Sequence, residues 1–320
     1  MAKSNYTNNV SVRGYVFSHT LRTAKNKNNE NVIFGAVNIA TDDDSINVVP
    51  VNFYVREKTK AGKQNATYAN LYQILSEGQT VETVGNESAF RVRVDGNIDV
   101  NDFYNRDGQL VTSQRVSGSF LHFLNANEPI ETPNTSASSF EADVMIPMVT
   151  EKETNDGSTY VSLAGFAFNY RGGLVPVTLS VESDSGKDFF LNEDISSSNP
   201  YFGKVWGKIK TSVVVSAREE DDAKTAFGAP KVRETSRSFR IWEVTGANTN
   251  DGLGPDTITR EELEAASNDR GAHLAELAEK AGQRNAPAAT GFSAAAPAQA
   301  VPTATPAADA AATNYENFNF

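Results

Sequence analysis

Val10-Ser-Val-Arg-Gly-Tyr-Val-Phe17 is the first of three strand-like runs that decide the fold, and it is followed by Val32-Ile-Phe-Gly-Ala-Val-Asn-Ile39 and Val48-Val-Pro-Val-Asn-Phe-Tyr-Val-Arg56. Successive side chains of a β-strand point to opposite faces, so each run divides into two sets of alternate residues. One set is mostly aliphatic and suits a core. The other set carries aromatic rings together with Arg or Asn. Each run is therefore predicted to be a strand with one buried face.

The elements that follow extend this pattern. Residues 67–78 have apolar side chains at helical spacing and end in Gly78, which indicates a short helix. Two further strand-like runs occupy 89–94 and 115–124. Three strands, a helix and two strands is the element order of an OB-fold, a five-stranded partly open barrel.

The same order returns after a linker at 125–139 that is rich in Asn, Pro, Ser and Thr. Val49-Pro-Val51 matches Val175-Pro-Val177, and Ser119-Phe120 matches Ser238-Phe239 at a similar offset. Such matches favour two copies of one domain, although short Val and Pro matches can arise in any β protein. We predict an all-β chain of two OB-fold-like Greek-key barrels in tandem, with a short helical segment and a disordered C-terminal tail. The expected divisions are a first barrel at 1–128, a second barrel at 140–247, a linker with short helices at 248–285, and an Ala/Pro spacer with a C-terminal tip at 286–320.

The second face of the first-barrel strands combines rings with cations. Rings suit the bases of a single strand and cations suit its phosphates, so this face has the chemistry of a nucleic-acid platform. The candidate residues on these strands are Arg13, Tyr15, Phe17, Phe34, Tyr54, Arg56, Arg91 and Arg93. Two basic loops add further cations, namely Arg22, Lys25, Lys27, Lys58, Lys60 and Lys63. The alternatives are rings that cover a second core layer and loop cations that are merely solvated.

The second barrel repeats the aromatic and basic pattern. Its candidate binding residues are Phe166, Phe168, Tyr170, Arg171, Trp206, Lys208, Lys210, Arg240 and Trp242. Lysines on the same strand face as Trp206 favour a binding role for that ring. For Trp242, a buried position in the core is an equal alternative.

The net charge of −11 is unevenly distributed along the chain. Residues 1–130 are neutral, 131–247 carry a net −5 and 248–320 carry a net −6. Nucleic-acid binding depends on which face holds the cations and not on the total. The negative total therefore does not argue against binding by the first segment, which is neutral and has cations of its own.

Several function classes find no support in the sequence. The absence of cysteine excludes disulfides and thiolate metal sites, and the three histidines lie far apart. No apolar run approaches the roughly 20 residues of a membrane span, and the N-terminus lacks an apolar signal region, so a cytoplasmic location is expected. The acidic runs 42–44 and 219–222 lack metal-ligand spacing and indicate solvated turns. We expect no cofactor, no metal and no enzymatic activity.

The chain closes on an Ala/Pro/Thr spacer at 286–313 and the tip Asn314-Tyr-Glu-Asn-Phe-Asn-Phe320. With its β-barrel pattern, aromatic-basic strand face and terminal Phe, it resembles the single-stranded DNA-binding proteins of bacterial or phage replication. That resemblance implies protection of single-stranded DNA during replication, repair or recombination, in the host cytoplasm if the chain is phage-encoded. It also implies recruitment of replication and recombination proteins by the tip, through Glu316, Phe318 and Phe320. The tip departs from the family pattern because it is rich in Asn and has only one Glu.

Three other functions stay open at this point. A virion structural protein would have a similar β-rich, Asn- and Thr-rich composition and would self-assemble. A carbohydrate- or peptide-binding β-domain would use the same rings without dependence on salt. A metal-dependent nuclease is the least favoured, because it would need the acidic runs as ligands.

Overall fold

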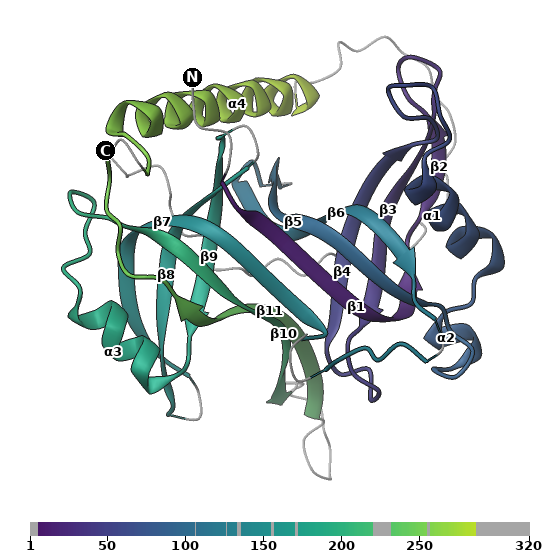
Figure 1. Ribbon diagram of the computed structural model, residues 1–320, viewed down its shortest axis with the longest axis horizontal. Helices are drawn as coiled ribbons and strands as arrows, with labels where there is room; N and C mark the ends of the chain where they lie inside the picture. The colour runs from purple at the N-terminus through teal and green to yellow at the C-terminus, as the bar shows by residue number, and fades with distance from the viewer. Residues whose placement is uncertain are drawn as a thin grey trace, which may run out of the picture.

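The computed structural model describes residues 6–105, 107–125, 127–132, 136–154, 157–169, 172–219, 232–254 and 257–285. Side chains are described for all of these except 212–219, 232–239 and 283–285. The predicted disordered tail at 286–320 lies outside the described residues. The all-β fold class predicted from the sequence is confirmed, because every strand belongs to one 11-stranded sheet that closes on itself twice (Figure 1).

The first closed circuit is built from the N-terminal strands. β1 pairs antiparallel with β3 and with β5, β3 pairs with β4, β5 pairs with β6, and a parallel pairing of β4 with β6 closes the barrel. This is the pairing scheme of an OB-fold, with helix α1 between the third and fourth barrel strands. The elements are β1 (Asn8–His19), β2 (Arg22–Lys25), β3 (Asn31–Ala40), β4 (Val48–Arg56), α1 (Ala66–Glu77), α2 (Val81–Val84), β5 (Arg91–Tyr104) and β6 (Leu110–Phe123).

The second circuit follows the same scheme. β7 pairs antiparallel with β8 and β10, β8 pairs with β9, β10 pairs with β11, and β9 meets β11 in parallel. Helix α3 again lies between the third and fourth strands. The elements are β7 (Ser138–Glu153), β8 (Thr159–Phe168), β9 (Leu174–Val181), α3 (Asp184–Asn192), β10 (Tyr201–Glu219), β11 (Val232–Ala247) and α4 (Arg260–Asn285).

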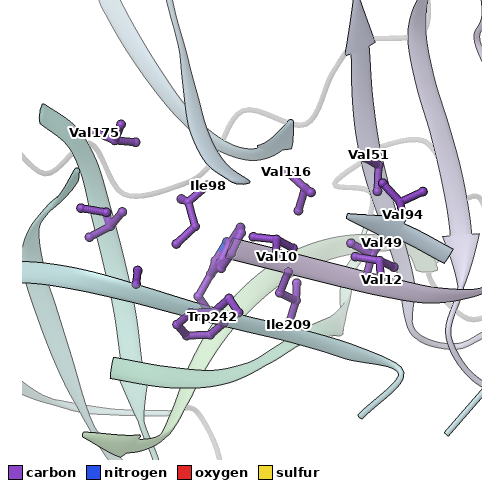
Figure 2. Packing of buried hydrophobic residues seen from close by; sticks show 14 of the residues in the cluster. Val10, Val12, Val49, Val51, Val94, Ile98, Val116, Val175, Ile209 and Trp242 are labelled. Atoms are coloured by element: carbon purple, nitrogen blue, oxygen red, sulfur yellow. The ribbon is translucent and has the colours of Figure 1, made fainter. Parts of the chain in front are cut away.

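The two barrels are joined through their first strands. β1 pairs antiparallel with β7, with Val10 opposite Phe140 at the centre of the paired segment. One hydrophobic cluster runs through both barrels, and Figure 2 shows Val10 and Ile98 of the first barrel near Ile209 and Trp242 of the second. Each such buried side chain contributes about 1.5–3 kcal/mol relative to an exposed one. The barrels therefore share a core and do not merely lie next to each other.

Hydrogen bonds reinforce this junction. The side-chain amide of Asn47, in the turn before β4, donates to the carbonyl of Ile209 at 3.1 Å and accepts from the Thr211 amide at 2.7 Å. The Thr211 hydroxyl also donates to the Val48 carbonyl at 3.0 Å. Strand β10 of the second barrel is thereby fixed against the first barrel.

Helix α1 starts and ends where its sequence signals indicate. Asn65 caps its start by accepting a hydrogen bond from the Thr67 amide at 3.1 Å, and Gly78 ends it with a left-handed φ of 62°. Tyr68, Leu71 and Ile74 are buried against the barrel. The helix therefore packs one face against the barrel along its whole length and leaves the opposite face in solvent.

Helix α4 is one continuous helix of 26 residues, where the sequence indicated short helices in a linker. The capping box at its start is present, with Thr259 and Glu262 exchanging side-chain-to-amide hydrogen bonds of 3.0 and 3.2 Å. Leu263 is fully buried in a second hydrophobic cluster with aromatic residues of β8 and β10. Arg270 binds Asp102 of β5 in a mostly buried ion pair at 3.0 Å. The helix thus packs on both barrels (Figure 1).

Candidate nucleic-acid interface

A row of side chains crosses the outer surface of β2, β3 and β4. In the strand register Arg22 lies opposite Phe34, and Phe34 lies opposite Tyr54. The Phe34 side chain is 37% exposed and that of Tyr54 is 65% exposed. Directly opposed residues on one face of a sheet bring their side chains into contact range. Three sequence candidates are thereby placed next to one another, with two rings open to solvent.

Cations surround this row. The segments 22–31 and 54–63 contain seven Lys or Arg residues and two carboxylates. Six of the cations make no ion pair with any residue that the structure describes, and they are Arg22, Lys25, Lys27, Lys58, Lys60 and Lys63. Arg56 lies 3.6 Å from Glu30. We name these six cations with Arg22-Phe34-Tyr54 the hairpin surface.

The two loops of the hairpin surface are held in register with each other. The Glu57 amide donates to the Asn31 carbonyl at 3.0 Å, and the Asn31 side chain donates to the Glu57 carboxylate at 2.8 Å. Asn26 accepts from the Glu30 amide within the β2–β3 turn, and Lys58 forms a β-bridge with Gln64 within the loop between β4 and α1. Preformed loops lose little conformational entropy on binding. The cations are therefore displayed on an ordered support.

A second group of candidates lies on β1 and β5, and its cations are engaged internally. Tyr15 lies opposite Arg91, whose guanidinium is 5.8 Å from the Tyr15 ring centroid. Arg91 also donates to the carbonyls of Asn125 and Glu128. Burial, followed by the nearby Asp43, raises the pKa of Tyr15. This group ties Asn125 and Glu128 to the barrel and offers less free charge to phosphates.

Two other arginines of the same face are paired as well. Arg13 forms an ion pair with Glu128, and Arg93 binds Asp95 at 3.0 Å. Phe17, also on β1, is half-buried. A cation held by a carboxylate must give up that partner before it can neutralise a phosphate, so these residues are weaker candidates than the hairpin surface.

In the second barrel, Trp206 offers an open ring on β10. It is 41% exposed, and its indole lies flat on Gly246 of β11, where any added side-chain carbon would come within 2.4 Å of the ring. Lys208, on the same strand face, is exposed and makes no ion pair with a described residue. Lys210 binds Glu243 at 2.6 Å and Glu182 at 3.4 Å, and despite its partial burial these carboxylates raise its pKa.

The remaining second-barrel candidates differ from the sequence interpretation. Phe166 and Phe168 are buried, because α4 covers the face of β8 that was expected to be open. Trp242 is buried with its ring 5.4 Å from Phe140 in an edge-on contact, so the core alternative holds for it. None of these three rings has a face available to a base. Arg240 is exposed on β11.

Some candidates lie outside the described residues, and they are Tyr170, Arg171, Glu316, Phe318 and Phe320. The acidic turn after β3 is structural: the Asp42 carboxylate accepts from the amides of Ile46 and Asn47 at 2.8 and 2.7 Å. Within the part of the chain that the structure describes, no three His, Asp or Glu side chains are grouped so that they could hold a metal ion. No helix among the described residues is long and apolar enough to cross a membrane.

Three exposed aromatics were missed from the sequence, and one of them is Phe103 on β5, which is 38% exposed. Tyr72 on α1 is 51% exposed, and Phe120 on β6 is 59% exposed. Helical spacing assigns Tyr68 to the core. Tyr72 lies four residues later on the same side of the helix, and the spacing alone does not show that its ring is open to solvent. Phe120 entered the sequence interpretation only through the match between Ser119-Phe120 and Ser238-Phe239.

The chain was compared with known protein families, curated proteins and solved structures. The profile of the YorF family matches residues 7–280, which is most of the chain. A search of curated proteins finds no match. Two similar solved structures are a deletion variant and the wild type of the single-stranded DNA binding protein from Thermus aquaticus. The variant has 11% identity and a TM-score of 0.47, covering 79% of this chain and 99% of its own. The wild type has 12% identity and a TM-score of 0.45, covering 78% of this chain and 96% of its own. At these scores the resemblance supports no statement about function.

Proposed function

The chain belongs to the YorF family, and we propose that it binds single-stranded DNA without sequence preference and without catalysing a reaction. The observation that carries this proposal is the hairpin surface. Phe34 and Tyr54 are exposed side by side within a group of six cations that have no ion-pair partner among the described residues.

The physical basis is the combination of stacking with charge. A base stacked on an aromatic ring contributes about 1–3 kcal/mol, and every base has a face that can stack. Each cation that neutralises a phosphate also releases condensed counterions. Rings and cations on one surface therefore bind a single strand by its two features that do not depend on sequence.

The second barrel supplies a further contact in this proposal. Trp206 and Lys208 repeat the pairing of an open ring with a cation that has no ion-pair partner among the described residues of β10 and its neighbours. Because the barrels share a core, the two surfaces are held at a fixed spacing. A DNA strand long enough to contact both surfaces should bind more tightly than a short DNA strand that contacts only one, because its second contact forms within the same complex.

The test is a titration of fluorescein-labelled oligo-dT at several salt concentrations. The logarithm of the affinity should fall linearly with the logarithm of salt, with a slope of about −0.7 for each phosphate neutralised. Replacing Lys58, Lys60 and Lys63 by Gln should reduce the slope by about 2. Lys152→Gln, on an exposed part of β7, is the matched control and should leave the slope unchanged.

The same titration separates the competing functions. Absence of oligo-dT binding at low salt would refute the proposal. Binding that does not change with salt would instead indicate a surface for sugars or peptides, which use rings without counterion release. Assembly of the free protein into large particles would favour a virion structural role.

We also propose the finer parts of this function. The two barrels act as domains within 1–128 and 140–247, and the tip at Glu316, Phe318 and Phe320 recruits replication or recombination proteins. The tip is supported by its aromatic residues at the end of an Ala- and Pro-rich segment. Since the tail is acidic, its removal should tighten oligo-dT binding at low salt. Unchanged or weaker binding would contradict competition between tail and DNA.

A further inference from the structure

A cleft lies beside the hairpin surface, between helix α1 and the β2–β3 hairpin. Its volume is about 320 Å³, and it is lined by Thr23, Ala24, Lys25, Asn31, Tyr68 and Tyr72. Small-molecule sites begin at roughly 300 Å³. We propose that this cleft is a subsite for one nucleotide of the bound strand, with Tyr72 as the stacking ring and Lys25 as the phosphate contact. This inference rests on the proposed function and extends it to a helix that the strand-face pattern did not include.

Two tyrosines of α1 build one wall of the cleft. Tyr68 and Tyr72 are one helical turn apart, with their ring planes inclined by only 8° and their centroids 6.3 Å apart. Tyr68 is 8% exposed and anchored in the core, and burial raises its pKa. Tyr72 is 51% exposed. A buried ring thus sets the orientation of an open one, which is the arrangement a stacking platform needs.

The opposite wall combines small, polar and cationic side chains. Thr23 and Ala24 are short, so β2 leaves room in front of the rings. Lys25 lies opposite Asn31 in the strand register and makes no ion pair with a described residue. The side-chain NH2 group of Asn31 donates to the Glu57 carboxylate, and the side-chain oxygen of Asn31 is the acceptor that we assign to a base edge.

The cleft shares the edge strand β2 with the hairpin surface but lies on the other face of that strand. Arg22 and Lys25 are the two ends of β2, an edge strand of the sheet, and lie about 10 Å apart at the usual rise per residue. Arg22 belongs to the row with Phe34 and Tyr54. Because Arg22 and Lys25 are three residues apart, their side chains point to opposite faces of β2. A single strand stacked on that row would therefore pass around the exposed edge strand β2 to reach Lys25 and Tyr72. A ligand that lacks either aromatic rings or negative charge would not use both the exposed rings and the cations.

The experiment compares Tyr72→Ala, Tyr72→Phe and Leu191→Ala in oligo-dT titrations of the full chain. Leu191 is the matched control because it is 45% exposed on α3, which occupies the position of α1 in the second barrel. Tyr72→Ala should weaken binding about 5- to 100-fold, the effect of losing one stacked base. Tyr72→Phe and Leu191→Ala should stay within about twofold of the wild type.

Photocross-linking of the unaltered protein gives a second readout that does not depend on how a variant folds. Oligo-dT containing 5-iododeoxyuridine should cross-link to Tyr72, as identified by mass spectrometry of the peptides. If oligo-dT binds, but Tyr72→Ala has wild-type affinity and no cross-link forms on α1, the subsite is refuted while the proposed function stands. If the unaltered protein does not bind oligo-dT, both proposals fail.

Discussion

Single side chains decide which parts of the strand faces can meet a ligand. The alternation of apolar and polar residues correctly predicts the buried set on β1 and β3, such as Val12, Val16 and Ile33. It could not predict that Arg13 would pair with Glu128, because Glu128 is 115 residues away and lies in an irregular segment. Side-chain exposure follows from alternation, whereas the partner of a charged group follows from the tertiary fold.

The Phe34 and Tyr54 rings should act as a unit in DNA binding. Each change to Ala is expected to weaken oligo-dT binding by about 1–3 kcal/mol. Because the rings are directly opposed, the double variant should lose less than the sum of the single losses. Isothermal titration calorimetry of the wild type, the two single variants and the double variant measures the coupling energy between the two rings. Met148→Ala, an exposed apolar residue on β7, serves as the control, and strict additivity would argue against a shared base.

His19 should make stability depend on pH. It is half-buried on β1, its Nδ1 has no hydrogen-bond partner among the described residues, and burial lowers its pKa below the usual 6.5. Below about pH 6.5 the unfolded chain therefore binds a proton that the folded chain resists, so stability is complete above that pH and falls as the pH is lowered. Melting temperatures at pH 7.5 and 5.5 measure the effect.

The matched comparison for this prediction uses His19→Asn and His273→Asn. The first variant should lose part of the pH dependence between 7.5 and 5.5. The second should keep it, because His273 is exposed on α4. Equal pH dependence in both variants would show that His19 does not carry the effect.

At the scale of elements, α4 explains where sequence reasoning failed. Alternation in β8 suggested an open face with Phe166 and Phe168, but Leu263 and Ala266 of α4 cover it. A strand that is covered on both sides loses the polar half of its pattern. The sequence of β8 alone holds no signal that a helix some 95 residues later will pack on it.

The ion pair between Arg270 and Asp102 should anchor α4 to the first barrel. Only 12% and 3% of these side chains are exposed, and Asp102 also accepts from the Thr112 hydroxyl at 2.6 Å. Arg270→Ala would leave a buried carboxylate without its cation, and such changes cost about 3–5 kcal/mol. Urea denaturation measures the loss. Lys280→Ala, which breaks an exposed pair with Glu276 on the same helix, should cause no measurable change.

At the scale of the whole molecule, the element order of each barrel could be predicted from sequence, but the shared core could not. The residues that meet across the junction, such as Val10 and Trp242, are separated by most of the chain. The sequence shows that these residues are apolar. It does not show whether they pack inside their own barrel or against the other barrel. That choice depends on the pairing of β1 with β7, which no local pattern encodes.

The shared core predicts that the two barrels unfold together. Both tryptophans lie in the second barrel, so their fluorescence in urea reports on that half. Amide hydrogen exchange of β3 and β4 reports on the first half. The two measurements should give the same free energy of unfolding, because separating the barrels exposes their common apolar surface. A clearly lower value for the β3 and β4 amides would indicate independent folding.

The antiparallel pairing of β1 with β7 has a consequence for how this molecule can change. Equivalent strands of two similar barrels meet around a local two-fold relation, as the copies in a symmetric dimer do. In a dimer of identical chains every substitution appears twice, so both halves must tolerate it. In this single chain a substitution changes only one of the two barrels. The first barrel can therefore keep Tyr72 open on α1 while α4 covers Phe166 and Phe168 of the second barrel, a difference that identical subunits could not have.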